Sequence, residues 1–313
     1  MSILYILLGG TLLYFGGDWL VSGATQLAKR FGVSPLVIGL TIVALGTSCP
    51  ELAAMLIAAL KGQPEIAVGA IIGSNISNIA LILGLSALIC PLTARLAFLK
   101  REVPIMIFTA ALFFPLAWLG YAGRAEGAIF VFLLIVYIWY TYTKGKEETT
   151  PDDYTAEIEN LAPSSLSWSI FLVIAGIAFL TKGADFLIEG AVLIATYFGI
   201  PEKVVGLTLV ALGTSLPELA SCIVAALRKE TDIILGNIIG SNIFNILGIM
   251  GTTALIRPFE ISMASVWIDL LVMMAVTLLL FPFLYRRLCL GRREGAFLVT
   301  FYIAYVGYLY TAL

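Results

Sequence analysis

The chain has 313 residues, of which 60% are hydrophobic and only 12% are charged, and its formal net charge is −2. Soluble domains carry about 25% charged residues, whereas apolar runs of the roughly 20 residues that cross a bilayer recur along this chain, so a soluble protein is excluded and a lipid bilayer is its expected surroundings. The absence of histidine excludes His-dependent hydrolases and His-ligated zinc, the lack of a basic stretch excludes a nucleic-acid partner, and nothing indicates an obligatory protein partner.

Apolar runs separated by polar breaks predict about ten membrane-spanning helices. The hydrophilic segment 144–167 separates a first unit, residues 1–143, from a second unit, residues 168–313, so each unit carries five helices. The predicted fold class is an all-α polytopic membrane protein. In chain order the helices are expected near residues 3–28, 35–60, 66–89, 103–120, 126–143, 168–195, 204–227, 233–256, 265–284 and 295–312.

The basic residues indicate the orientation, because cytoplasmic loops of membrane proteins are enriched in Lys and Arg. If the N-terminus lies outside, 13 of the 18 basic residues fall in cytoplasmic loops and 4 in outside loops. We therefore expect both termini outside and segment 144–167 in the cytoplasm. The 13 residues are Lys29, Arg30, Arg95, Lys100, Arg101, Lys144, Lys146, Arg228, Lys229, Arg286, Arg287, Arg292 and Arg293.

The chain contains an internal repeat. A shift of 167 positions aligns residues 18–91 with residues 185–258 without a gap, and about 40 of the 74 aligned positions are identical. The best-matched blocks are VALGTSCPELAA with VALGTSLPELAS and GAIIGSNISNI with GNIIGSNIFNI. Because each unit has an odd number of spans, the second must cross the membrane in the opposite sense. We expect two inverted five-helix repeats, which in transporters place the substrate site near the mid-plane.

Each half carries a proline within a polar block, at Gly46–Glu51 in the second span and Gly213–Glu218 in the seventh. Proline removes an amide donor and clashes with the preceding turn, so each helix should kink or break and free carbonyl groups near Ala44 and Ala211. Carbonyls, Thr and Ser hydroxyls and a carboxylate are hard oxygen ligands. They suit Na⁺, Ca²⁺ or Mg²⁺ rather than copper or zinc.

Glu51 and Glu218 would lie at bilayer depth, where a carboxylate costs at least about 2.5 kcal/mol. No basic residue in the repeated blocks offsets their charge, so two facing carboxylates would either hold a divalent ion or carry protons. Asp18 and Asp185 also repeat, but Lys182 stands three residues before Asp185 on one helical face, which favours a structural ion pair there.

The second repeated block adds polar side chains to one face of a helix. Ser74 and Asn78 stand one helical turn apart, as do Ser241 and Asn245, so each pair shares a face. Their hydroxyl and amide oxygens could complete an oxygen cage around the ion.

These blocks carry a family resemblance. GTSCPE and GTSLPE, followed by GSNISN and GSNIFN, resemble the two alpha-repeats of sodium/calcium exchangers in the calcium/cation antiporter superfamily, and above all the short prokaryotic, YrbG-like members. The resemblance covers the whole chain. It implies a ten-helix inverted-repeat fold in which the first and sixth helices slide past the other eight and expose one central site to each side alternately.

The resemblance also implies the ion ligands. It assigns ligand roles to Ala44, Thr47, Ser48, Glu51, Ser74 and Asn78 in the first repeat and to Ala211, Thr214, Ser215, Glu218, Ser241 and Asn245 in the second, the two alanines through their carbonyls. One departure from the family is the asparagine at 245, where the archaeal exchanger and the potassium-dependent branch resemble each other in having an aspartate. The site therefore has two carboxylates, enough to neutralise one Ca²⁺, and lacks a third. The missing carboxylate argues against potassium dependence and leaves the ion stoichiometry open.

The function expected from the residues and the resemblance together is Ca²⁺/Na⁺ antiport across the plasma (inner) membrane, with both ions competing for Glu51 and Glu218 and no cofactor. The alternative is a Ca²⁺/H⁺ antiporter in which the same glutamates carry protons. An intramembrane enzyme fits poorly because Ser48 and Ser215 have no general base other than the ligand carboxylates. A cation channel would differ by lacking obligatory countertransport, and a transport-free scaffold by being insensitive to Glu51→Gln.

Overall fold

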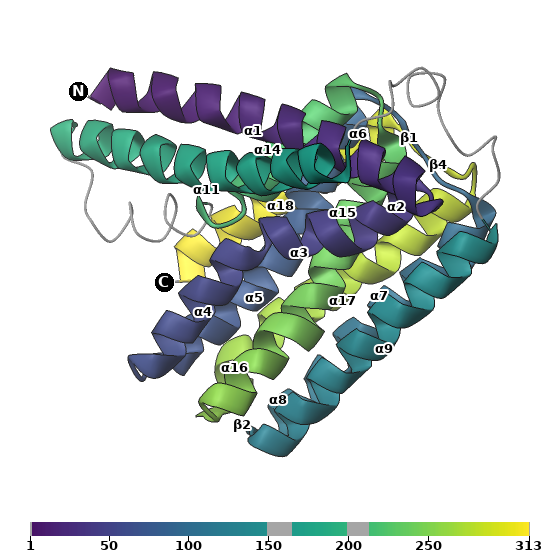
Figure 1. Cartoon of the computed structure of the whole chain (residues 1–313). Helices are drawn as coiled ribbons and strands as arrows, with labels where there is room; N and C mark the ends of the chain where they lie inside the picture. Colours follow the sequence, from purple (N-terminus) through teal and green to yellow (C-terminus); the bar gives the residue numbers. More distant parts are fainter. Residues whose placement is uncertain (1, 149–164, 199–212, 313) are drawn as a thin grey trace.

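The computed structural model describes residues 2–148, 165–198 and 213–312, and helices dominate it (Figure 1). The helices are α1 (Ser2–Phe31), α2 (Pro35–Ile38), α3 (Ala44–Thr47), α4 (Cys49–Leu60), α5 (Pro64–Ser77), α6 (Gly84–Ile89), α7 (Leu96–Ala111), α8 (Phe113–Leu119), α9 (Arg124–Glu148), α11 (Leu166–Tyr197), α14 (Leu216–Leu227), α15 (Thr231–Ile243), α16 (Gly251–Ile256), α17 (Met263–Tyr285) and α18 (Arg292–Ala312). Within the described residues, three π-helical segments continue or join them: η1 (Gly39–Val43), η2 (Asn78–Leu83) and η5 (Phe244–Met250).

The described helices agree in part with the predicted membrane spans. Seven helices of the described residues are long and apolar enough to cross a bilayer, and one bent pair, Pro35–Thr47 with Cys49–Leu60, makes an eighth candidate. The helix Leu216–Leu227 is shorter, and most of the predicted span before it lies outside the described residues. The mostly helical membrane fold is thus confirmed, whereas the count of ten stays a prediction.

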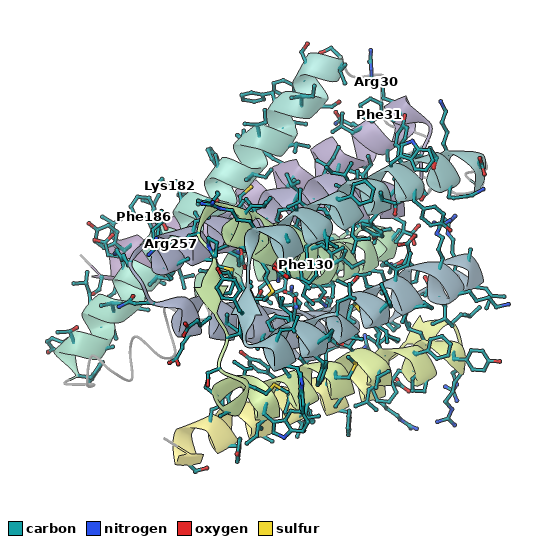
Figure 2. The ribbon with its side chains drawn as sticks, turned by 90° about the horizontal axis from the view of Figure 1, so that it is seen from below. Arg30, Phe31, Phe130, Lys182, Phe186 and Arg257 are labelled. Atoms are coloured by element: carbon teal, nitrogen blue, oxygen red, sulfur yellow. The ribbon has the colours of Figure 1, made fainter. Side chains whose placement is uncertain are left out.

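Many large apolar side chains face outward, as a bilayer requires. Phe132, Ile174 and Trp118 are 64%, 63% and 81% exposed. Figure 2 shows side chains covering the outer faces of the helices, while Phe130 lies among the ribbons. Phe130 is itself buried, so the interior and the lipid-facing surface both carry large apolar side chains.

The outermost pair of helices is α1 with α11, which lie side by side along one flank (Figure 1). They are antiparallel and very close: a Cβ on Gly16 would stand 2.7 Å from the Leu180 amide nitrogen, and a Cβ on Gly176 would stand 2.7 Å from that of Leu20. Only glycine permits such an approach at these points. The two helices occupy equivalent places in the repeat, so this pair of equivalent helices runs in opposite directions.

The centre of the molecule is the continuous segment α15–η5–α16. Its most apolar window, within Thr231–Ile256, is completely buried by protein, compared with 28% for α1. Here too glycines bring backbones together, because a Cβ on Gly236 would lie 2.6 Å from the Leu36 carbonyl oxygen and one on Gly240 would lie 2.5 Å from that of Leu40. This contact places α15 directly against η1 and α3.

Four two-residue strands join the halves, a feature that the sequence did not predict. The strands are β1 (Leu92–Thr93), β2 (Tyr121–Ala122), β3 (Phe259–Glu260) and β4 (Cys289–Leu290). β1 pairs antiparallel with β4, and β2 pairs antiparallel with β3. The strands β1 and β3 are equivalent in the repeat, as are β2 and β4, so each pairing links one half to the other and occurs twice.

Candidate cation site

Two helices begin at the proline-containing blocks, and each carries a glutamate in its first turn. The segment containing Pro50 bends by 42° between α3 and α4, with Ser48 at the break. Serine at the start of a helix and glutamate three residues later usually cap that helix locally, but neither Ser48 nor Ser215 makes a side-chain capping bond. The predicted break is therefore present at Pro50, and the serine side chains are available for other contacts.

The serines instead reach across to the glutamate of the other half. Ser48 Oγ donates to Glu218 Oε1 at 3.0 Å, and Ser215 Oγ donates to Glu51 Oε1 at 3.4 Å. Each carboxylate also lies at the positive end of its own helix dipole, α4 or α14, which favours negative charge there. The two helix N-termini thus converge, and the carboxylates predicted from sequence face one another's helices.

Both carboxylates are buried with one oxygen left over. Glu51 is 8% exposed and Glu218 is fully buried, and the Oε2 atom of each has no hydrogen-bond partner among the described residues. Among the described residues, no Lys or Arg forms an ion pair with either carboxylate. Buried charge without compensation is expensive, so this pair of oxygens requires a cation or protons.

Two asparagine amides add further unpartnered oxygens. Asn78 begins η2 and donates its Nδ2 to Asn242 Oδ1 at 3.4 Å, and Asn245 in η5 donates its Nδ2 to Asn75 Oδ1 at 3.1 Å. Both amides are buried, and the Oδ1 atom of Asn78 and of Asn245 has no partner within the described chain. Neutral amide oxygens of this kind are good ligands for Ca²⁺ and Na⁺.

Asn75 and Asn242 support those amides and were missed by sequence reasoning. Their own Nδ2 groups contact the sulfur atoms of Met273 and Met106, each at 3.6 Å. Each of these contacts has a counterpart shifted by 167 positions. The internal repeat is therefore present in the side-chain contacts as well as in the sequence. The sequence signal was the asparagine of the two GSN blocks, because Asn75 directly follows Ser74 and Asn242 directly follows Ser241.

The hydroxyl groups of the site lie beside the carboxylates but are held differently in the two halves. Ser241 Oγ donates to Asn237 Oδ1 at 3.4 Å. Thr47 Oγ1 lies 3.2 Å from the same oxygen and 3.1 Å from the Val43 carbonyl, so the two acceptors share its one hydroxyl proton. On the other side, Asn245 Nδ2 donates to Ser74 Oγ at 3.2 Å, and Ser74 Oγ lies 3.5 Å from Ser215 Oγ.

Thr214, half-buried, directly precedes Ser215, so the remaining predicted hydroxyl of the second half lies at the start of α14. The predicted carbonyl ligands have separate outcomes. The Ala44 carbonyl accepts the Ser48 amide at 3.1 Å and also lies 3.4 Å from Thr47 Oγ1, while Ala211 lies outside the described residues.

Asn237 is the second residue that sequence reasoning missed. Its Nδ2 lies 3.3 Å from both Ser221 Oγ and Cys222 Sγ, and Ser221 Oγ donates to the Glu218 carbonyl at 2.9 Å. The amide is therefore oriented with its oxygen toward Thr47. The first repeat has alanine at the equivalent position, Ala70, so the signal was one of the two mismatches in this block, the one at which the second repeat gains a polar side chain.

The weaker candidates fall outside the site. Lys182 Nζ and Asp185 Oδ2 form the predicted ion pair at 3.0 Å, and both side chains are exposed. Asp18 pairs with Arg228, which also donates to Ser22. Neither aspartate contacts the buried carboxylates, so both are explained by structure.

Fold and site together define a helical membrane protein with a buried, oxygen-rich candidate cation site. The described residues contain no cluster of three or more His, Cys, Asp and Glu side chains that could hold a metal, so the donor set is two carboxylates with neutral oxygens, a set that suits Ca²⁺ or Na⁺ rather than a transition metal.

Comparison with known proteins identifies the family. The pattern of the family described as "Sodium/calcium exchanger protein" matches residues 1–143 and 168–311. The chain is 39% identical to the putative antiporter CaxA of Alkalimonas amylolytica, over 99% of this chain and 98% of that protein. It is 36% identical to the inner membrane protein YrbG of Escherichia coli (strain K12), over 97% and 95%.

A solved structure agrees with this result. The sodium-calcium exchanger NCX_Mj superposes with a TM-score of 0.84 at 34% identity, covering 98% of both chains. The chain therefore belongs to the sodium/calcium exchanger family, and it is a membrane antiporter and not an enzyme. The resemblance inferred from GTSCPE, GTSLPE and the GSN blocks is confirmed.

Proposed function

We propose that the protein exchanges Ca²⁺ for Na⁺ at the buried site between α4 and α14. The observation that carries the proposal is the set of four buried oxygens without hydrogen-bond partners in the described chain. They are Glu51 Oε2, Glu218 Oε2, Asn78 Oδ1 and Asn245 Oδ1. They come as two equivalent pairs, they include both carboxylates, and carboxylate and amide oxygens are the ligands that hard cations prefer.

The charge balance supports Ca²⁺ as one cargo ion. Glu51 and Glu218 together carry two negative charges, which one Ca²⁺ neutralises. We assign Ca²⁺ to the space between them, with Thr47 and Thr214 as supporting ligands. Because no third carboxylate is present in the described part of the site, the fully loaded calcium state is neutral, and this lowers the cost of holding it inside the membrane.

Sodium would use the same carboxylates with a different set of hydroxyls. Ser48 and Ser215 already contact the opposite glutamates, and Ser74 and Ser241 lie in the same network. Two Na⁺ ions at these hydroxyls would draw on the same two charges as one Ca²⁺. Binding is then mutually exclusive, and that competition couples the opposite fluxes.

The proposed mechanism is alternating access by two inverted five-helix repeats, residues 1–143 and 168–313. It is supported by the antiparallel packing of α1 against α11 and by the duplicated strand pairs between the halves. The glycine contacts make α1 and α11 one unit on the flank of the core. In this proposal that unit slides past the core, as in transporters built from inverted repeats.

The proposal includes ten spans with both termini outside, and it places segment 144–167 in the cytoplasm. The distribution of Lys and Arg supports this orientation. A plasma (inner) membrane location is supported by the relative YrbG, which is described as an inner membrane protein. Calcium extrusion from the cytoplasm would follow from this location and an inward Na⁺ gradient.

The test is ⁴⁵Ca²⁺ uptake into proteoliposomes. Vesicles preloaded with Na⁺ are compared with Na⁺-free vesicles that carry an imposed pH gradient. Uptake driven only by the outward Na⁺ gradient, and absent in Glu51→Gln, is the expected result. Uptake driven by the pH gradient without Na⁺ would replace the proposal with Ca²⁺/H⁺ antiport, in which Glu51 and Glu218 carry protons. Flux without any counter-ion would indicate a channel.

A further inference from the structure

The two halves share a second motif, at the point where a strand leads into a helix. Residues 123–128 read GRAEGA before α9, and residues 291–296 read GRREGA before α18. A left-handed turn precedes each motif, at Gly120 with φ 72° and at Leu288 with φ 49°. The two loops therefore have the same backbone form at opposite ends of the repeat, and they can be compared residue by residue.

Their side chains differ sharply in charge. The first loop has Trp118 and Leu119 before its turn, 81% and 68% exposed, and these suit the membrane interface. The second loop has Arg286 and Arg287 at those places and adds Arg293 where the first loop has alanine. Three arginines have therefore been placed on one copy of a shared backbone, and the backbone itself does not require them.

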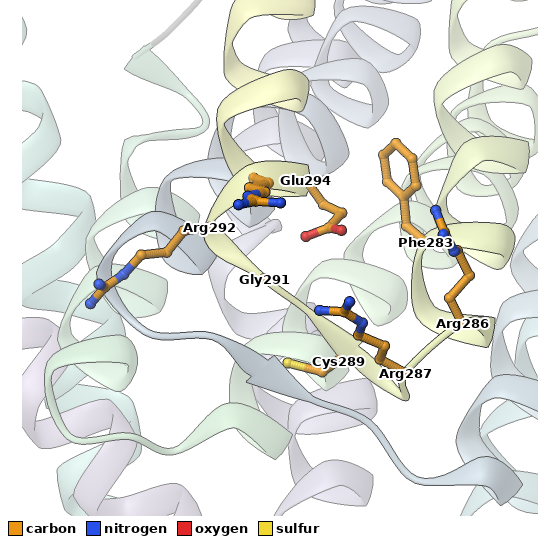
Figure 3. Close-up of a pocket in the computed structure, with 8 residues that line it drawn as sticks. Phe283, Arg286, Arg287, Cys289, Gly291, Arg292 and Glu294 are labelled. Atoms are coloured by element: carbon orange, nitrogen blue, oxygen red, sulfur yellow. The ribbon is translucent and has the colours of Figure 1, made fainter.

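These arginines surround a cavity of about 680 Å³ that we call the arginine pocket. It is lined by Phe283, Arg286, Arg287, Cys289, Gly291, Arg292, Arg293 and Glu294. Figure 3 shows the side chains of Arg286, Arg287 and Glu294 directed into one space, with Arg292 pointing away. Four arginines and one glutamate leave three net positive charges. Burial, with Glu294 nearby, raises the pKa of Cys289, so the thiol stays neutral and does not offset them.

Three of the four arginines of the pocket have no partner among the described residues. Arg292 donates its Nε to the Leu88 carbonyl at 3.1 Å. Arg286, Arg287 and Arg293, in contrast, make no hydrogen bond or ion pair with any described residue. Glu294 is the one carboxylate that lines the pocket, so the remaining positive charges repel each other and favour binding of an external anion.

The backbone that presents these groups is rigid and strained. Leu288 has a left-handed conformation that L-residues rarely adopt, and its carbonyl accepts the Ala94 amide at 2.8 Å. Cys289 and Leu290 then pair with β1. The first loop has the same support, because the Gly120 carbonyl accepts the Ile261 amide at 2.9 Å and β2 pairs with β3, but glycine adopts the left-handed turn without strain. The second loop therefore keeps the turn despite strain, and the turn sets Arg287 against the start of α18.

We propose that the arginine pocket binds the phosphate group of an anionic membrane phospholipid. Guanidinium groups bind phosphate oxygens in bidentate fashion, and a pocket of basic side chains between membrane helices suits a lipid headgroup. The pocket lies between the end of α17 at Tyr285 and the start of α18 at Arg292, where headgroups meet the protein. The inference is independent of the proposed exchange site.

The test uses the full chain in neutral detergent, titrated with dioctanoyl phosphatidylglycerol while Tm is followed by tryptophan fluorescence. A ligand that binds only the folded state raises Tm. We expect a saturable rise for the wild type and none with dioctanoyl phosphatidylcholine. In the triple variant Arg286→Gln, Arg287→Gln and Arg293→Gln, the half-saturating lipid concentration should rise by roughly 100-fold.

Two controls keep the inference falsifiable. Arg124→Gln in the equivalent first loop should respond to phosphatidylglycerol as the wild type does. A triple Arg→Lys variant, which keeps the charge and loses the bidentate geometry, should give an intermediate response and decides the question if the Gln variant does not fold. An unchanged response in the Gln variant overturns the proposal. An equal rise with inorganic phosphate assigns the pocket to free phosphate and overturns the lipid as its ligand.

Discussion

The two halves of the candidate cation site have equivalent contacts at their carboxylates and amides, but different contacts at their other hydroxyl groups. The carboxylates and their serines exchange equivalent bonds across the halves, and the asparagine amides do the same. The hydroxyls do not: Thr47 and Ser241 turn to Asn237, whereas the other half has Ala70 at that position. A single residue therefore makes a duplicated site unequal.

This difference indicates separate roles for the duplicated groups and for Asn237. In the proposed exchange cycle, the duplicated groups would supply the charge and the unpartnered oxygens. Asn237 contacts hydroxyls on one side only. A hydroxyl that donates its proton to the amide oxygen, as Ser241 does, turns its lone pairs elsewhere, where a cation could use them. Substituting a duplicated carboxylate or amide tests whether both halves contribute to transport. Substituting Asn237 alone tests what the difference between them does.

The largest effect is expected from neutralising either carboxylate. Glu51→Gln or Glu218→Gln removes one of two charges and should lower Na⁺-dependent ⁴⁵Ca²⁺ uptake by roughly 100-fold or more, as loss of a buried charged partner does. Asp269→Asn is the matched control, since Asp269 accepts only the Tyr305 hydroxyl, at 2.7 Å, among the described contacts. Equal losses in all three variants would remove the assignment of the site.

The next effect tests the amide oxygens. Asn78→Ala and Asn245→Ala each remove one buried ligand oxygen, and we expect each to raise the half-saturating Ca²⁺ concentration by about tenfold. The two values should agree because the residues are equivalent in the repeat. Uptake kinetics in proteoliposomes measure both. A tenfold change in one variant with none in the other would show that only one half contributes its amide.

A smaller and one-sided effect is expected at Asn237. Asn237→Ala makes the second half resemble the first, and it should raise the half-saturating ion concentration about fivefold while the maximal rate stays within a factor of two. The loss of rate and affinity together, in proportion to loss of folded protein, would indicate a purely structural residue. Ala70→Asn is the reciprocal variant, and transport by it measures whether the first half tolerates the same amide.

The smallest effect is expected outside the site. Lys182→Gln breaks the exposed ion pair with Asp185, and exposed pairs contribute little. We expect transport to change by less than about twofold and Tm to stay near the wild-type value. A large loss of uptake would place Asp185 in the transport pathway, and it would revive the transport role that the structure does not support.

Much of the site was predictable from the sequence. The repeat aligned Glu51 with Glu218 and Asn78 with Asn245, and all four carry the unpartnered oxygens. Asn237 was not predicted, because a mismatch within a repeat has no meaning until its neighbours are known. The strand pairs were not predicted either, because two residues carry too little pattern to indicate a strand.

By itself, the sequence determined that the chain crosses a membrane, that it is built from two related halves, and which residue types could bind a cation. Hydrophobic length and duplication are properties of the chain in one dimension and need no contacts. Tertiary structure alone decided which groups meet. Ser48 reaches Glu218 across 170 positions, and Asn75 reaches Met273 across 198. Such partners, and the oxygens left without one, depend on how the halves pack together.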